Sequence, residues 1–154
     1  MLRFLPSLGR GVLAALALLW SFAASAQTAV LTATEAQTAA LAGKVVLIDI
    51  RSPPEWKETG VPASAHAITM HQKREGLLAE LGKVTGGSKS QPIALICATG
   101  SRSSFLSGWL KSQGYTAISD VAEGVMGGRS GKGWIKSSLP LRKWEPGKSA
   151  PGQP

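Results

Sequence analysis

Cysteine is almost absent from the 154-residue sequence, since Cys97 is the only one. A single thiol excludes a disulfide within the chain. Long apolar runs are scarce too, because no stretch after residue 26 is long enough to span a bilayer. Acidic residues are few and the formal net charge is +8. The basic residues are scattered rather than gathered in a stripe, so we expect small anions as partners, and neither nucleic acid nor a membrane surface.

The one long apolar run lies at the N-terminus. Arg3 and Arg10 precede the almost unbroken apolar run Gly11–Phe22, and the small residues Ala24–Ala26 follow it. This order is typical of a secretory signal peptide. We therefore predict that residues 1–26 are removed and that the mature protein is exported, to the periplasm. The apolar run is short for a membrane span, and an uncleaved N-terminal anchor is the alternative.

The remaining chain of about 128 residues suffices for one compact domain. We assign residues 27–145 to this domain and residues 146–154, which are rich in proline, glycine and serine, to a flexible C-terminal tail. Short apolar runs alternate with segments of helical pattern along the domain. Such alternation predicts an α/β fold with a mainly parallel central sheet flanked by helices.

The expected elements follow from apolar periodicity and from glycine and proline positions. Strands are predicted at Lys44–Ile50, Ala65–Met70, Ile93–Ile96 and Tyr115–Ser119. Helices are predicted from a Thr32–Glu35 capping box through Ala36–Ala42, at Glu55–Glu58, at His71–Leu81 with Gly82 as its stop, and from the loop after Cys97 to about Gln113.

Cys97 stands where a buried strand gives way to a loop and a helix. Backbone N–H groups of such a loop, with the positive end of the helix dipole, stabilise a thiolate. Gly100 tolerates the positive φ that a tight loop needs, and Arg102 supplies a charge that can hold an anionic substrate or the thiolate. Two interpretations of Cys97 are a nucleophile and a small buried apolar residue. A free thiol in an exported chain favours the nucleophile.

Two motifs support this interpretation through a family resemblance. The segment ICATGSRS, Ile96–Ser103, resembles the Cys-x-x-Gly-x-Arg-Ser loop of the rhodanese (sulfurtransferase) domain. Independently, Ile48–Trp56 resembles the family's segment with an Asp-x-Arg pair followed by Glu and an aromatic residue. Weaker matches are Pro62 with Ala65 and Gly124 with Trp134, so that the resemblance covers about Leu31–Leu141.

The resemblance implies a rhodanese-like fold and sulfur transfer without a cofactor or metal. Cys97 would take a sulfane sulfur from a small anionic donor such as thiosulfate, and the resulting persulfide would pass it to cyanide or a thiol. Residues that would hold the persulfide or the donor are Ala98, Thr99, Gly100, Ser101, Arg102 and Ser103. An exported redox protein is a further expected partner.

Asp49 and Arg51 are expected to support this site. The resemblance makes Asp49 a structural group and Arg51 either its ion-pair partner or a charge at the rim. Both residues follow the carboxyl end of a predicted parallel strand, as Cys97 does. We therefore expect Asp49–Arg51 and Cys97–Arg102 to face the same crevice.

Two other functions remain as alternatives. The first alternative is a sulfur carrier or partner-binding module of the same fold, with little turnover of its own, since sequence does not separate a carrier from an enzyme. Phosphatase relatives of this fold have a Cys-to-Arg loop one residue longer, whereas only four residues separate Cys97 from Arg102. The shorter loop suits a sulfur atom better than a phosphate.

Several other features carry less weight. His66 and His71 do not share a helix face and so do not predict a metal site. Gly82–Ser90 lacks the spacing of a phosphate-binding loop. Gly60 stands where the family often has a histidine, and the glycine-rich segment Val125–Gly133 is expected to form a loop near the crevice.

Overall fold

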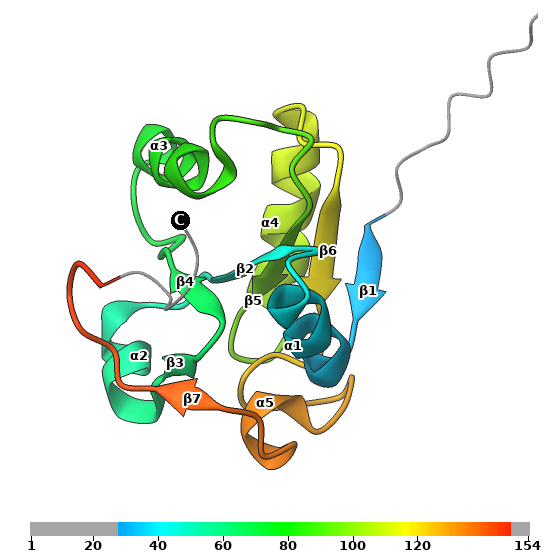
Figure 1. Ribbon diagram of the computed structural model, residues 1–154, viewed down its shortest axis with the longest axis vertical. Helices are drawn as coiled ribbons and strands as arrows, with labels where there is room; N and C mark the ends of the chain where they lie inside the picture. The colour runs from blue at the N-terminus through cyan, green and yellow to red at the C-terminus, as the bar shows by residue number, and fades with distance from the viewer. Residues whose placement is uncertain (1–27, 149–154) are drawn as a thin grey trace, which may run out of the picture.

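Five parallel strands form the central sheet of the computed structural model, which describes residues 28–148. Their spatial order is β1 (Ala29–Leu31), β6 (Ile118–Val121), β5 (Ile93–Ile96), β2 (Val46–Asp49) and β4 (Ala65–Ala67), as Figure 1 shows. The predicted α/β fold with a mainly parallel sheet is confirmed. The predicted signal peptide and residues 149–154 of the predicted tail lie outside the described residues.

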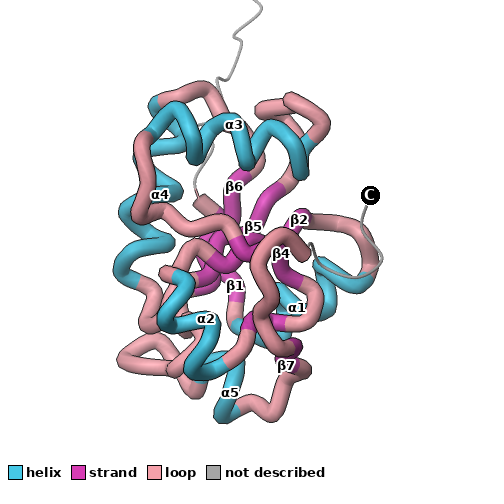
Figure 2. Tube along the Cα trace, turned by 90° about the vertical axis from the view of Figure 1, so that its left-hand side faces the viewer, coloured by secondary structure: helices cyan, strands magenta, loops and turns pink. Residues whose placement is uncertain are grey.

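Helices cover both faces of this sheet (Figure 2). They are α1 (Ala33–Leu41), α2 (Pro53–Thr59), α3 (Arg74–Thr85), α4 (Ser101–Ser112) and the short α5 (Gly133–Lys136). A small antiparallel pair, β3 (Val61–Pro62) with β7 (Leu141–Arg142), lies apart from the main sheet. No helix of the described residues is long and apolar enough to cross a membrane.

The strands are buried on both faces, and successive residues point into two separate cores. Leu47, Ala94 and Ile96 pack against α1 and α5, whereas Ile48, Ile93 and Leu95 pack against α3 and α4. Cys97 lies two residues after Leu95 and belongs to the same core as Ile93 and Leu95. Its side chain therefore belongs to the face of the sheet that α3 and α4 cover.

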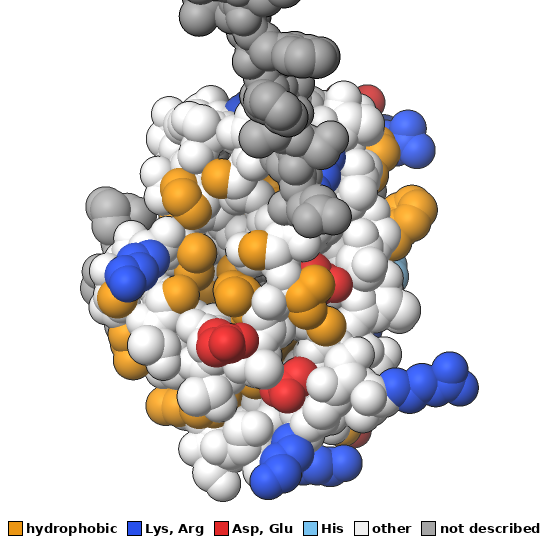
Figure 3. All heavy atoms as spheres, turned by 90° about the vertical axis from the view of Figure 1, so that its right-hand side faces the viewer, with side chains coloured by type: hydrophobic (Ala, Val, Ile, Leu, Met, Phe, Trp, Pro, Cys, Tyr) orange, Lys and Arg blue, Asp and Glu red, His pale blue; other side chains and the backbone are white. Residues whose placement is uncertain are grey.

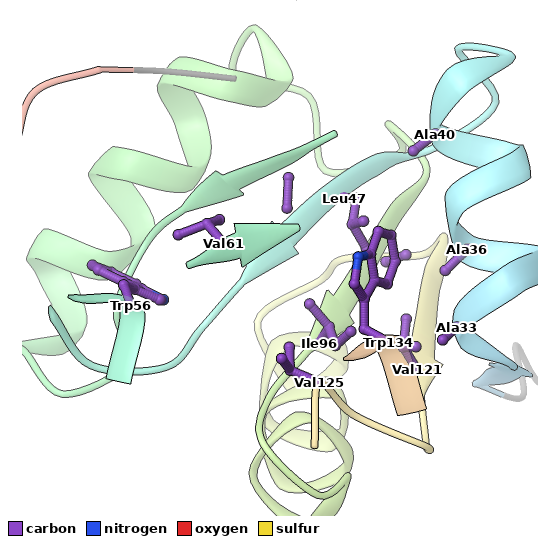
Figure 4. Packing of buried hydrophobic residues seen from close by; sticks show 12 residues of the cluster. Ala33, Ala36, Ala40, Leu47, Trp56, Val61, Ile96, Val121, Val125 and Trp134 are labelled. Atoms are coloured by element: carbon purple, nitrogen blue, oxygen red, sulfur yellow. The ribbon is translucent and has the colours of Figure 1, made fainter. Parts of the chain in front are cut away.

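Trp134 fills the core on the α1 face (Figure 4). Its indole is fully buried between α1 and the strand residues Ile96 and Val121, and its Nε1–H donates to the carbonyl of Pro140 at 2.9 Å. The alanines of α1 allow this helix to approach the large ring closely. Trp56 of α2 belongs to the same cluster, and its ring lies 5.5 Å from that of Trp144.

Most element predictions are confirmed in type, and three are wrong in their bounds. β4 ends at Ala67 rather than at Met70. The Thr32–Glu35 capping box is present at the start of α1. The third helix runs through Gly82, where it was expected to stop, because Leu81 and Thr85 are buried and a Cβ at Gly82 would meet nothing. It ends at Thr85, and its C-cap residue Gly86 has a left-handed φ of 61°. β6 begins at Ile118 rather than Tyr115, three residues later than expected.

Strand β1 was not predicted from sequence. Its three residues pair only with β6, which lies about ninety positions further along the chain. It forms one edge of the sheet, where Val30 is 66% exposed. The face beside β1 and α1 carries a group of exposed apolar side chains (Figure 3).

Candidate active site

Cys97 follows the carboxyl end of β5 and has no exposed surface. Its Sγ accepts a hydrogen bond from the N–H of Gly100 at 3.1 Å and lies 3.5 Å from Oγ of Ser103. The loop between β5 and α4 thus curls around the sulfur. The first turn of a helix has N–H groups without partners inside the helix, so this surrounding favours an anionic sulfur.

Gly100 allows the loop to curl so tightly. Its φ is +95°, and it is the N-cap residue of α4. A Cβ at this position would stand 2.1 Å from the carbonyl oxygen of Ala122. Ser103 supports the same turn, because its hydroxyl donates to the carbonyl of Gly100 at 3.0 Å. No residue other than glycine fits between the loop and the segment after β6.

The glycine-rich segment binds the loop from its other side. The N–H of Val125 donates to the carbonyl of Cys97 at 2.8 Å, and that of Met126 donates to the carbonyl of Ala98 at 2.9 Å. Gly124 permits this approach, since a Cβ there would stand 2.3 Å from the Ala98 oxygen. The prediction that this segment lies near the site is confirmed, and the contact fixes the backbone of the Cys97 loop.

Arg102 is held by two residues from other elements. Its Nη2 lies 2.5 Å from Oε1 of Glu55 and its Nη1 lies 3.0 Å from Oε2, so the pair is bidentate. Nη1 also lies 3.1 Å from Nε2 of His71. A guanidinium can only donate, so Nε2 of His71 is the acceptor in this contact.

The electrostatic effect of this pairing is mutual. The hydrogen bonds from Arg102 lower the pKa of Glu55 to about 2; burial opposes this shift, and hydrogen bonds from Ser52 add to it. Glu55 in turn raises the pKa of Arg102, and the nearby Cys97 adds to that increase. The positive charge beside the loop is therefore permanent but already partly neutralised.

Asp49 and Arg51 form a buried ion pair, with Nη2 of Arg51 2.6 Å from Oδ2 of Asp49. Arg51 also donates to Oγ1 of Thr59 and to the carbonyl of Gly60. Of the two roles considered, Arg51 is the ion-pair partner and not a rim charge, because only 1% of it is exposed.

The expectation that Asp49–Arg51 and Cys97–Arg102 face one crevice is wrong. Asp49 is opposite Ile96 in the sheet, one residue before Cys97, and alternation along a strand sends neighbours to opposite faces. Asp49 has no exposed surface. The ion pair therefore supports the end of β2 from within the protein.

Asp120 of β6 is a further buried acid on the Cys97 face of the sheet. It pairs with Leu95 in register and is 6% exposed. Its Oδ1 has no hydrogen-bond partner among residues 28–148. Burial raises the pKa of Asp120, and a side-chain hydrogen bond with Ser103 opposes that rise.

The structure brings the predicted loop residues together around Cys97. Gly100 and Ser103 are buried, Ala98 and Arg102 are half-buried, and Thr99 and Ser101 are exposed. Sequence reasoning missed Glu55, His71 and Asp120 as members of the site. The glutamate of the Ile48–Trp56 motif was a signal for Glu55, whereas no local pattern identified the other two.

The two histidines do not come together. His66 is buried on β4, while His71 lies beside Arg102. Among residues 28–148, no three of the histidine, cysteine, aspartate and glutamate side chains are grouped as a metal site requires.

Comparison with known proteins matches residues 32–130 to the rhodanese-like domain. An uncharacterized protein of Rickettsia prowazekii is 26% identical over 102 residues, which are 61% of this chain and 80% of the relative. A rhodanese-like domain from Anabaena superposes with a TM-score of 0.59 at 17% identity, covering 83% of this chain and 89% of that one. A rhodanese-like domain protein from Staphylococcus aureus gives 0.53 at 22% identity, covering 75% and 99%. These two structures have the same fold.

Proposed function

Because this chain belongs to the rhodanese-like domain family, we propose that it is a sulfurtransferase that carries a sulfane sulfur on Cys97. The observation that supports this most is the hydrogen bond of 3.1 Å from the N–H of Gly100 to Sγ. It places a buried thiol at the positive end of α4, where a sulfur anion is stabilised. The proposed donor is thiosulfate, and the proposed acceptors are cyanide and thiols.

In the first step, the Cys97 thiolate attacks the outer sulfur of thiosulfate after its proton has passed to water. A bond forms between Sγ and that sulfur, and the sulfur–sulfur bond of thiosulfate breaks. Sulfite leaves with the electron pair. The N–H groups at the start of α4 and the Ser103 hydroxyl surround the new persulfide, which carries the negative charge.

In the second step, cyanide or a thiolate attacks the outer sulfur of the persulfide. The bond between this sulfur and Sγ breaks, and its electron pair returns to Sγ. Thiocyanate or an acceptor persulfide leaves, and the Cys97 thiolate is restored. Arg102 is the cationic residue nearest to Cys97 along the sequence. Its charge attracts both anionic donors and anionic acceptors to the loop.

Mass spectrometry tests this proposal directly. Incubation of the protein with thiosulfate is expected to add about 32 Da, the mass of one sulfur atom, and cyanide is expected to remove it. Cys97→Ser is expected to show neither change. An unmodified wild-type mass after incubation with thiosulfate would contradict the proposal.

The complete burial of Cys97 also favours a second candidate, a sulfur carrier that is loaded by a partner and turns over slowly alone. Both candidates form the same persulfide, so they differ in rate. Steady-state release of thiocyanate from thiosulfate and cyanide would identify an enzyme. A protein that takes up one sulfur atom from thiosulfate and shows no further turnover with cyanide would identify a carrier.

The proposal also covers the location of the mature protein and a protein partner. Residues 1–26 have the pattern of a signal peptide, so we expect the mature protein in the periplasm, in contact with an exported redox protein. Fractionation of cells that express the full chain, with N-terminal sequencing of the product, tests export. A full-length protein found in the cytoplasm would contradict it.

A further inference from the structure

A pocket of about 560 Å³ lies beside the Cys97 loop. The loop residues Thr99 and Ser101 form one wall, and Arg129 and Ser130 of the glycine-rich segment form another. Asp120 and Ala122, at the end of β6, also line it. We call this space the Asp120 pocket. Its volume is in the range of small-molecule binding sites.

Asp120 gives the pocket an acceptor without a partner. The residue is 6% exposed, and its Oδ1 has no hydrogen bond from the described residues. A buried oxygen left in this state destabilises the protein. A ligand that brings an N–H donor, above all a positively charged one, would remove this destabilisation.

Arg129 gives the pocket a charge of the opposite sign. It is exposed and forms no ion pair with the residues that the structure describes. The hydroxyls of Ser101, Ser104 and Ser130 add neutral donors and acceptors to the walls. The pocket thus offers a carboxyl group at one point and a guanidinium at another. An α-amino acid, with an ammonium and a carboxylate on one carbon, matches this pair of charges.

The pocket is also close to the sulfur chemistry. Gly100 connects the two places, since it lines the pocket and its N–H donates to Sγ of Cys97 at 3.1 Å. A persulfide extends the sulfur by a further bond of about 2 Å. A ligand with its amino-acid end in the pocket would therefore present its side chain at the loop that holds Cys97.

We propose that the Asp120 pocket binds the amino-acid end of a thiol acceptor, with the ammonium at Asp120 and the carboxylate at Arg129. Cysteine and glutathione both carry this group. The inference rests on the proposed sulfur transfer for the role of the ligand, but not for its binding. The bound thiol loses its proton to water, and its sulfur attacks the outer persulfide sulfur. That sulfur leaves with the acceptor as a persulfide, and the electron pair of the broken bond returns to Sγ of Cys97.

Binding is tested without any reaction. Calorimetry measures the affinity of full-length Cys97→Ser protein for S-methylcysteine and S-methylglutathione, which cannot accept sulfur. Asp120→Asn and Arg129→Gln, each made in this background, are expected to weaken binding at least about tenfold, as the loss of one good charge contact does. Lys132→Gln is the matched control, because it removes an exposed cation of the same segment outside the pocket.

Affinities that do not differ between Arg129→Gln and Lys132→Gln would overturn the proposal, and so would a failure of both methyl thioethers to bind. Binding of one thioether and not the other would show which size of ligand the pocket takes. Because Arg129 is exposed, its variant is expected to fold even if the Asp120 variant does not.

Kinetics gives a second, separate readout. Arg129→Gln is expected to raise KM for glutathione or cysteine about tenfold while KM for cyanide, which has neither charged group, stays unchanged. An equal change for both kinds of acceptor would contradict the proposal. If the wild-type protein transfers no sulfur at all, the proposed function is wrong. The calorimetric result still shows whether the Asp120 pocket binds the amino-acid end of a thiol.

Discussion

The guanidinium of Arg102 is bound to the carboxylate of Glu55 by two hydrogen bonds, the shorter of 2.5 Å, although the residues are 47 positions apart. The contact joins the first turn of α4 to the first turn of α2. It also means that the cation beside the Cys97 loop is already paired before any donor arrives. An anionic donor must therefore compete with Glu55 for Arg102.

Replacing Glu55 is expected to strengthen donor binding. Glu55→Gln keeps an acceptor for Ser52 but removes the charge that opposes Arg102. An exposed or half-exposed pair is worth up to about 1 kcal/mol, so KM for thiosulfate is expected to fall about two- to fivefold. Glu58→Gln, at an exposed position on the same helix, is the control. A higher KM in Glu55→Gln than in this control would show that Arg102 acts on the donor only when Glu55 holds it.

Glu55 also makes stability depend on pH. Its pKa is about 2 in the folded protein against 4.5 for a free glutamate. A lowered pKa contributes stability that is complete above the unfolded value and is lost as the pH falls toward the folded value. The wild type is therefore expected to lose its stability advantage over Glu55→Gln as the pH is lowered from about 5.5 to 2. Urea unfolding at several pH values measures this, and a constant difference would contradict it.

Gly100 is expected to be irreplaceable for local geometric reasons. Gly100→Ala places a Cβ 2.1 Å from the Ala122 oxygen at a φ of +95°. Strain of this kind costs at least about 1–3 kcal/mol, and the distorted loop is expected to lose persulfide formation. Gly108→Ala is the matched control, because a Cβ there meets nothing and α4 is expected to gain up to about 1 kcal/mol. Thermal unfolding and the sulfur-addition assay distinguish the two variants.

The Asp49–Arg51 pair is expected to matter for folding. Asp49→Asn leaves Arg51 charged, buried and without its counterion. Breaking a buried pair in this way costs about 3–5 kcal/mol, which denaturant unfolding would record. Since Asp49 lies on the face of the sheet away from Cys97, the folded fraction is expected to form the persulfide as the wild type does. A loss below about 1 kcal/mol would contradict the structural role.

The centre of the site could be predicted because its signals are local. The apolar strand, the lone cysteine, Gly100 and the helical spacing after it stand within twenty residues, and β5 has the predicted bounds. The capping box at Thr32 is equally local. Such patterns depend on the chain's own backbone preferences and need no knowledge of what packs nearby.

The rest depended on contacts between distant segments. The sequence does not show that Asp49 and Cys97 point to opposite faces, because that follows from the register of β2 against β5. The same holds for β1, whose three residues form a strand only beside β6. The position of Asp120 beside Ser103 likewise arises from the pairing of β5 with β6. Helix α3 passed through Gly82 because burial of its neighbours outweighed the propensity of one glycine.

The zero exposure of Cys97 has a consequence for selectivity by size. The loop around it is hydrogen-bonded to the glycine-rich segment on one side and, through Arg102, to α2 on the other. A sulfur enclosed in this way is reached more easily by a slim ion than by a bulky disulfide. In an oxidising compartment, the same enclosure would keep the only thiol of the chain reduced between turnovers, ready for a small sulfur donor.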